Sequence, residues 1–186
     1  MVTEKFTKEH MGLTKDFECG NYIIDRFIKC SDALDENQGI TYVMLSKQKD
    51  VIIGFYNIEA GRIDQIEQTG GLISYKSMGG AVNINYLAIH SSFQKKKIGV
   101  NEGRNIYLGD LLLNDCEKRI LDLRKKVGIS FVTLCSTNEG YYLYKVRNSY
   151  EDFEDDMSIS ISDRDVDTYK MYKCVDDILS ISEPYE

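Results

Sequence analysis

The sequence predicts an α/β fold in which helices flank a mixed, mainly antiparallel sheet. Short runs rich in β-branched and aromatic residues recur along the chain. The first two of these runs are separated only by a short polar turn, which favours an antiparallel hairpin. Between two later runs, a long segment carries apolar residues at the period of an α-helix.

Length and composition are those of an ordinary soluble protein. The 186 residues are a single-domain length, and a chain of this size buries roughly 70% of its unfolded surface. No apolar run approaches the roughly 18 residues of a membrane span, and Met1 to Lys5 does not begin a signal peptide. We therefore expect one domain over residues 1–186, no membrane partner and a cytoplasmic location.

The cysteines and histidines offer no framework for a metal site. The five cysteines are odd in number, widely spaced and form no Cys-x-x-Cys pair. Only His10 and His90 could join them in a cluster. We expect free, buried thiols in a reducing compartment and no bound metal. The five are Cys19, Cys30, Cys116, Cys135 and Cys174.

The net charge of −7 is concentrated in one segment. Residues 151–166 hold seven acidic side chains against Arg164, a local balance of −6 that leaves the remainder of the chain near −1. This segment is expected to be a solvated loop. An acidic surface repels phosphate backbones, so nucleic acid is disfavoured as a partner unless a local basic patch overrides the repulsion.

The first helix is expected to follow the turn at Phe17-Glu18-Cys19-Gly20-Asn21, with Asn21 as its N-cap. Apolar residues then recur at helical spacing on one face, and Asn37-Gln38-Gly39 ends the segment. These apolar residues are Ile23, Phe27, Cys30 and Leu34.

Two strands, 41–45 and 51–58, follow as a hairpin joined by a polar turn. Residues 64–80 contain two Gly-Gly pairs around a short apolar segment, and we interpret them as an excursion outside the core. The next strand ends at Tyr86 to His90, where strict alternation is lost. Further strands are expected at 129–134 and 169–173.

The long helix is expected to run from Asp110, as N-cap, to about Lys126, with Gly128 as its C-terminal stop. A start at Gly99 would place Gly103 and Gly109 inside the helix at about 1 kcal/mol each, so a start near Gly109 is favoured. The expected buried stripe consists of Leu112, Cys116, Ile120, Leu123 and Val127.

A strand that leads through a loop to a helix N-terminus forms an anion site, because unpaired N–H groups and the positive end of the helix dipole converge there. The loop here contains two degraded copies of one pattern, Gln94 to Gly99 and Arg104 to Gly109. Both resemble the acetyl-coenzyme A signature of the GNAT acyltransferase superfamily: Gln or Arg, two residues, Gly, any residue, then Gly or Ala. Lys97 and Tyr107 replace the first Gly of the two registers. An insertion of about ten residues that splits one loop would reconcile them.

Other stretches extend this resemblance over nearly the whole chain. Phe17 to Ile28, and the strand from Gly54 to Ile63 with its Ala60-Gly61, are similar to the branch that contains toxin acetyltransferases of toxin–antitoxin pairs. Leu143-Tyr144 and Met171-Tyr172-Lys173 match later motifs of the branch. The resemblance implies a GNAT fold whose central sheet splays at a bulged site strand.

The resemblance also implies the site residues. The cofactor's pyrophosphate would bind the loop, its pantetheine arm the end of the site strand and Asn138. The implied cofactor-binding residues are Leu87, Ala88, Ile89, Gln94, Lys97, Gly99, Arg104, Tyr107, Leu108, Gly109, Asp110 and Asn138.

Tyr144 is the implied acid that protonates the departing thiolate, since a phenol with a pKa of about 10 stays protonated at neutral pH. Tyr141 and Tyr142 are alternatives in register. Glu59 and His90 are candidates for the general base by reach alone, and ordered water could serve instead.

The expected reaction is direct transfer of acetyl from acetyl-CoA to an amine. The acceptor stays open between a small amine, a protein amine and, as the toxin resemblance implies, aminoacyl-tRNA. A homodimer or an antitoxin partner is also open. The rival hypothesis is a non-catalytic binding module with the same fold, because the missing glycines at Lys97 and Tyr107 normally allow close approach of the pyrophosphate.

Overall fold

The computed structural model describes residues 3–101, 103–159 and 168–182. The chain forms two compact units, one from residues 1–59 and 85–116, the other from residues 60–84 and 117–186. Strands β3 (Ile52–Thr69) and β4 (Leu72–Ile89) and helix α2 (Leu108–Arg124) each contribute to both units. The expectation of a single domain stays a prediction. No helix in the described part of the chain is long and apolar enough to cross a membrane.

The first unit contains an antiparallel sheet. Strand β1 (Thr3–Lys5) pairs with β2 (Ile40–Leu45), and β2 pairs with β3, with Val43 opposite Phe55. The predicted hairpin between the second and third strands is therefore confirmed. Strand β4 is the next neighbour of β3.

Helix α1 (Tyr22–Lys29) begins at the predicted N-cap, where the Asn21 side chain accepts hydrogen bonds from the N–H groups of Ile23 and Ile24. The predicted continuation to Leu34 is wrong, because Cys30 is extended and short 3-10 turns follow, η2 (Ser31–Leu34) and η3 (Glu36–Gln38). The predicted face is also displaced. Ile23 is 47% exposed, whereas Phe27 and Ile28 are buried. A further 3-10 turn, η1 (Lys8–Thr14), precedes α1.

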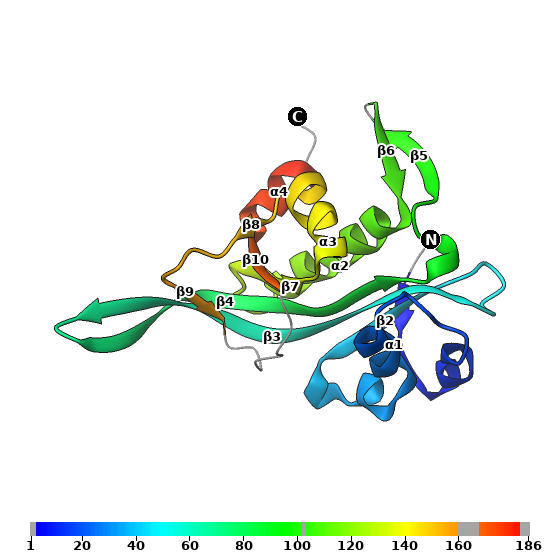
Figure 1. The fold of residues 1–186 in the computed structure, drawn as a ribbon, viewed down its shortest axis with the longest axis horizontal. Coiled ribbons are helices and arrows are strands. Elements are labelled where there is room, and N and C mark those ends of the chain that lie inside the picture. The colour runs from blue at the N-terminus through cyan, green and yellow to red at the C-terminus, as the bar shows by residue number, and fades with distance from the viewer. Residues whose placement is uncertain (1–2, 102, 160–167, 183–186) are drawn as a thin grey trace. The chain divides into compact units, whose positions relative to one another are not determined.

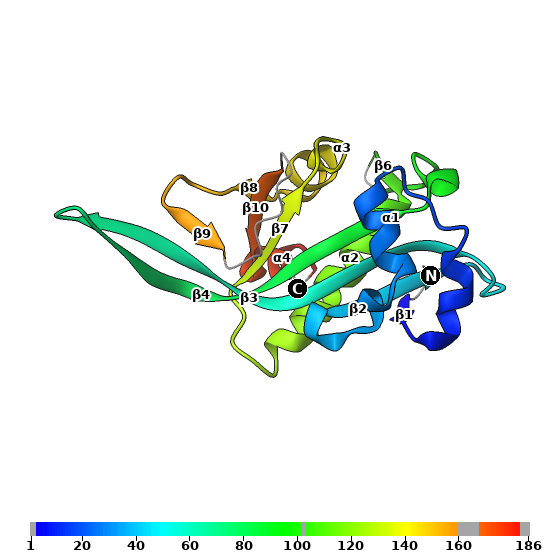
Figure 2. The ribbon, with the colours of Figure 1, turned by 60° about the horizontal axis from the view of Figure 1, so that its bottom comes forward.

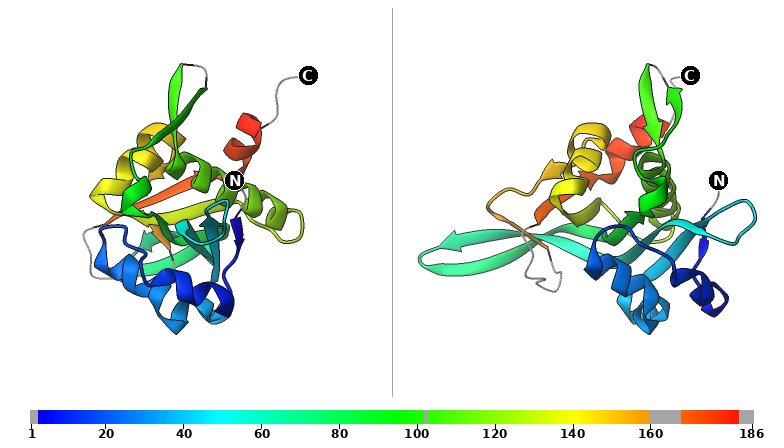
Figure 3. Two further views of the ribbon diagram at one scale, coloured as in Figure 1. Left: turned by 90° about the vertical axis from the view of Figure 1, so that its right-hand side faces the viewer. Right: turned by 45° about the vertical axis from the view of Figure 1, so that its right-hand side comes forward.

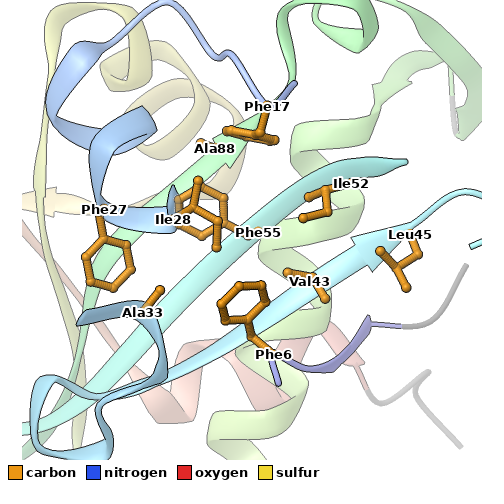
Figure 4. Packing of buried hydrophobic residues seen from close by; sticks show 10 residues of the cluster. All are labelled: Phe6, Phe17, Phe27, Ile28, Ala33, Val43, Leu45, Ile52, Phe55 and Ala88. Atoms are coloured by element: carbon orange, nitrogen blue, oxygen red, sulfur yellow. The ribbon is translucent and has the colours of Figure 1, made fainter. Parts of the chain in front are cut away.

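Aromatic rings dominate the core of this unit (Figure 4). Phe55 of β3 lies edge-on to Phe17 at 5.3 Å and is stacked with Phe27 of α1 at 6.2 Å. Phe27 is in turn stacked on Tyr86 of β4 at 4.2 Å. Because burying one such ring contributes about 1.5–3 kcal/mol, this cluster fixes α1 on β3 and β4.

The segment between β4 and α2 is not the irregular loop expected from sequence. A short 3-10 turn, η4 (Ser91–Phe93), is followed by β5 (Lys97–Asn101) and β6 (Arg104–Tyr107), which form a separate two-stranded sheet. Figure 1 shows this hairpin leading directly into α2. Gly103 next to its turn has φ +77°, a conformation that favours glycine.

Helix α2 begins at Leu108, so the prediction of Asp110 as N-cap is wrong. Asp110 lies in the first turn, where its Oδ2 accepts the Tyr107 N–H at 2.9 Å. Leu112, Cys116 and Ile120 are buried as predicted, each 0% exposed. Leu123 and Val127 are exposed, because the helix ends at Arg124 and its last turn leaves the core.

The second unit is built on β7 (Phe131–Ser136). It pairs in parallel with β4 and antiparallel with β10 (Tyr169–Cys174), which pairs with β8 (Glu151–Asp152). Short helices α3 (Asn138–Tyr141) and η5 (Tyr142–Arg147) follow β7, and α4 (Val175–Ser182) follows β10 (Figure 2). The predicted strands at 129–134 and 169–173 are confirmed within two residues.

Residues 64–80 form the end of a long β3–β4 hairpin with a turn at Gly70-Gly71 (Figure 3). Residues 67–78 are exposed, which agrees with an excursion from the core, and apart from the turn at Gly70-Gly71 they are strand. Strand β9 (Met157–Ile159) pairs with β3 beside this hairpin. The predicted acidic loop is thus partly strand, and Asp163, Arg164 and Asp165 lie outside the described residues.

All five cysteines are free thiols. Only Cys116 is buried, whereas the other four are half-buried, so the expectation of buried thiols is too broad.

Candidate active site

Pairing between β4 and β7 stops partway along both strands. The parallel register runs from Ala81 to Ile84 and from Phe131 to Leu134, yet β4 continues to Ile89 and β7 to Ser136. Beyond Ile84 and Leu134 the two strands are no longer paired with each other, as expected if the sheet splays at the site strand.

Side-chain alternation along β4 is broken at Asn85 and Tyr86. Asn85 donates to the Asn57 side chain at 2.8 Å, and Tyr86 stacks on Phe27. Asn57 lies on the same face of β3 as Phe55, which is also stacked with Phe27. Two consecutive residues of β4 therefore contact one face, as at a β-bulge.

The C-terminal end of β4 is held tightly. Ala88 and Ile89 are 6% and 8% exposed, and Leu87 is half-buried. A Cβ at Gly54 would lie 2.7 Å from the Ala88 carbonyl oxygen, so only glycine allows β3 to approach here. The His90 N–H donates to the Ile53 carbonyl oxygen at 2.9 Å.

Gln94 holds this strand end to the N-terminal segment. Its Nε2 donates to the carbonyl oxygens of Ile89 at 2.9 Å and Cys19 at 2.8 Å. The next residue, Lys95, has φ +57° and redirects the chain into β5. The role of Gln94 in the structure is therefore to donate hydrogen bonds from its side-chain amide, which join the end of β4 to the segment around Cys19.

Lys97 and Tyr107 are opposite one another in the β5–β6 register. They are the two residues that replace the first Gly in the two copies of the signature. If the hairpin residues 97–106 are set aside, Gln94-Lys95-Lys96 is followed by Tyr107-Leu108-Gly109. This composite sequence departs from the signature only at Tyr107. The hairpin thus lies where the predicted insertion would split the loop, and the insertion itself stays a prediction.

The remaining loop residues are placed differently. Arg104 is exposed and pairs with Asn101 next to the turn, at the opposite end of the hairpin from α2. Gly99 has open space where a side chain would project and an ordinary φ, so its strand does not require glycine. The Lys96 ammonium lies 5.0 Å from the Phe93 ring centre.

The N-terminus of α2 completes the loop. The first four N–H groups of an α-helix have no partner within the helix, and the helix dipole makes this end positive. Leu108, Gly109 and Asp110 supply this turn. The Asp110 carboxylate stabilises the turn through the Tyr107 N–H but adds a negative charge.

The second unit carries Asn138 and Tyr144. Asn138 is exposed at the start of α3, whose N-cap is Thr137. Tyr144 is 7% exposed and lies in a π-helical turn, a rare geometry that recurs at functional sites. By contrast, Tyr142 is 60% exposed, and the Tyr141 hydroxyl donates to Asp152 at 3.1 Å. Of the three tyrosines in register, Tyr144 alone is buried.

The two candidate general bases have different surroundings. The Nδ1 of His90 accepts the Ser92 N–H at 3.1 Å, so its Nε2 carries the proton and donates to the Asp16 carbonyl oxygen at 3.0 Å. Both ring nitrogens are engaged in hydrogen bonds to the backbone, which argues against His90 as a base. Glu59 is half-buried at a point within β3, not at a strand end as expected.

A buried polar cluster in the second unit was not anticipated from sequence. Glu117 accepts both the Tyr150 hydroxyl and the Lys173 ammonium, and all three side chains are buried. A signal existed, because Glu117 shares a helical face with Leu113 and Ile120, and Lys173 shares a strand face with Met171.

Comparisons with known proteins bear on the fold. No protein-family model and no curated protein matches the chain. Among solved structures, a bacterial toxin has a TM-score of 0.73 at 17% identity, over 100% of this chain and 97% of that one. The KacTA complex with DNA has a TM-score of 0.66 at 16% identity, over 97% and 96%.

A tyrosine-to-phenylalanine variant of the toxin AtaT, bound to the C-terminus of the antitoxin AtaR and to acetyl-CoA, has a TM-score of 0.62. Its sequence is 13% identical to this chain, and the match covers 98% of each of the two chains. These likenesses, together with the mainly antiparallel sheet and its flanking helices, show that the predicted GNAT fold is correct.

Proposed function

We propose that this protein is an N-acetyltransferase that uses acetyl-CoA as co-substrate. The observation that supports the proposal is the pairing of Lys97 with Tyr107. We interpret Gln94 and Gly109, on either side of this pair, as the two ends of one interrupted signature at the N-terminus of α2. The likeness in fold to a toxin solved with acetyl-CoA supports it.

The pyrophosphate would bind the N–H groups of the first turn of α2, with Lys97 adding positive charge at the hairpin base. The backbone of Leu87 to Ile89 would receive the pantetheine arm, and Asn138 could hydrogen-bond it. Tyr107 at the first Gly position restricts how closely the phosphates approach the backbone. We propose that the charge of Lys97 offsets this restriction.

The reaction forms a C–N bond between the amine and the acetyl carbonyl carbon and breaks the C–S bond of the thioester. The amine loses one proton, and the departing thiolate gains one. We assign the second proton to the Tyr144 hydroxyl, and burial of this side chain limits competing water. Since both ring nitrogens of His90 are hydrogen-bonded to the backbone, we propose that ordered water accepts the amine proton.

A toxin that acetylates aminoacyl-tRNA is the second candidate, favoured by one observation. Four exposed cations lie in or beside the β5–β6 hairpin of an otherwise acidic chain, which supplies the local basic patch that an RNA backbone would require. They are Lys95, Lys96, Lys97 and Arg104. The likeness to toxins solved with an antitoxin supports an antitoxin as a partner of this chain as well. A small amine and a protein amine stay open as acceptors.

The test is release of free CoA thiol from acetyl-CoA in the presence of a polyamine, a lysine-containing peptide or aminoacylated tRNA. We expect turnover with one acceptor, and a loss of about 10²-fold or more in Tyr144→Phe at unchanged affinity for acetyl-CoA. Tyr142→Phe is the matched control and should keep activity. Binding of acetyl-CoA without turnover on any acceptor would favour the non-catalytic module.

A further inference from the structure

The buried cluster in the second unit links three elements. Glu117 Oε1 of α2 accepts the Tyr150 hydroxyl at 3.0 Å and the Lys173 ammonium of β10 at 3.1 Å. The ammonium also lies 5.4 Å from the centre of the Tyr150 ring. Residue exposures are 5% for Glu117, 4% for Lys173 and 1% for Tyr150.

Stability alone does not explain this arrangement. Removing two charges from water costs several kcal/mol per ion, and well-packed apolar residues are often at least as stable in place of such a pair. What the pair supplies is direction. Its shared oxygen fixes where the Tyr150 hydroxyl lies, and with it the direction of the long axis of the ring.

Tyr150 in turn holds Tyr144 at two points. Its N–H donates to the Tyr144 carbonyl oxygen at 3.1 Å, and its ring lies edge-on to the Tyr144 ring at 5.5 Å and 70°. The intervening Ser149 has φ +58°, which turns the chain back toward the π-helical turn. On its other side, the Tyr144 ring lies 3.3 Å from where a Cβ on Gly140 would be.

We infer that Glu117, whose buried charge is compensated by Lys173, acts through Tyr150 as a positioning residue for Tyr144. This inference rests on the proposed function, because Tyr144 matters as the acid only if the protein transfers acetyl groups. An acid that is displaced by a fraction of an ångström still permits cofactor binding but loses rate in the chemical step. The cluster should therefore affect kcat and not KM.

The first arm of the test is kinetic. Tyr150→Phe keeps the ring and removes the bond to Glu117. We expect kcat to fall about tenfold with KM for acetyl-CoA unchanged. Tyr56→Phe is the matched control, since Tyr56 is also fully buried and its hydroxyl donates to the Asp115 carboxylate at 2.7 Å. Equal losses of kcat in the two variants would overturn the inference, because they would report a shared loss of stability.

The second arm does not depend on activity. The protein's 13 tyrosines are labelled with 3-fluorotyrosine, and the Tyr144 fluorine resonance is identified as the one absent from Tyr144→Phe. We expect this resonance to shift or broaden in Tyr150→Phe and to stay in place in Tyr56→Phe. An unmoved resonance in Tyr150→Phe would overturn the inference even in a protein without acetyltransferase activity.

A double variant covers the risk that single charge changes unfold the protein. Glu117→Gln with Lys173→Met removes both charges and keeps an oxygen that can accept the Tyr150 hydroxyl. We expect it to retain the wild-type Tyr144 resonance and a kcat within about threefold of wild type. A shifted resonance in this folded variant would contradict positioning through that hydrogen bond.

Discussion

Lys97 and Tyr107 lie opposite one another in the β5–β6 hairpin, although ten positions separate them in the chain. Each replaces a glycine in one copy of the phosphate-binding pattern. This pairing is consistent with our prediction that the two copies are the two ends of one loop, separated by an inserted hairpin.

Gln94 is expected to stabilise the fold through the two hydrogen bonds that its side-chain amide donates. In Gln94→Glu the side chain has nearly the same size, but a carboxylate cannot donate to the carbonyl oxygens of Ile89 and Cys19. We expect the free energy of unfolding to fall by about 2 kcal/mol in urea denaturation. Gln38→Glu, at an exposed position in η3, is the control and should change it by less than about 0.5 kcal/mol. Equal effects would show that the two bonds of Gln94 are not structural.

Asp110 is expected to have opposite effects on folding and on cofactor binding. Its carboxylate favours the positive end of α2, so Asp110→Asn should lower the free energy of unfolding by about 0.5 kcal/mol. The same charge repels a phosphate at this helix end, so affinity for acetyl-CoA should rise about threefold. Calorimetric titration and urea denaturation measure the two effects. Asp122→Asn removes the same charge near the other end of α2, and an equal gain in affinity there would refute the local explanation.

Cys19 is expected to be unreactive at moderate pH. Burial, and then the nearby Asp25 carboxylate, raise the pKa of its thiol to about 12. The thiolate fraction at pH 8 is then lower than in the unfolded chain by on the order of 10³. Alkylation by iodoacetamide, followed by mass spectrometry, should be slow in the native protein and fast in urea.

The raised pKa of Cys19 also predicts how the stability of the fold changes with pH. A thiol whose pKa is higher in the folded state stabilises the fold below the unfolded pKa of about 8.5, and this contribution is lost as pH rises toward 12. Wild type should therefore lose stability between pH 8.5 and 10.5 by more than Cys19→Ser does. Parallel losses in the two proteins would contradict the raised pKa.

Much of the fold could be predicted because local signals and burial agree. Asn21 caps α1 as its side-chain chemistry indicates, and Leu112, Cys116 and Ile120 form the buried face that their spacing predicts. The errors lie at element ends. The start of α2 at Leu108 lies within one residue of the favoured start near Gly109, but the N-cap prediction is wrong because a carboxylate can accept an N–H from the first turn as well as from the N-cap.

The inserted hairpin was harder to predict because it has no core behind it. Ile98 and Val100 alternate as in a strand, but they are 42% and 55% exposed, and lysines precede them. The turn residue Gly103 was the available signal. The Glu117–Lys173 pair was missed for a different reason. Charged residues are rarely fully buried, and only tertiary structure brings an α2 residue to β10.

The most direct test of the composite loop is calorimetric titration with acetyl-CoA of wild type and of a variant that lacks residues 97–106. In this variant Gln94-Lys95-Lys96 continues into Tyr107-Leu108-Gly109, and Tyr107→Gly in the same background completes the signature. Circular dichroism confirms that each variant is folded. We expect wild type to bind, the shortened protein to bind within about tenfold of wild type, and the glycine variant to bind more tightly than the shortened protein. No binding by wild type at millimolar acetyl-CoA, or loss of binding in a folded shortened protein, would contradict the proposal.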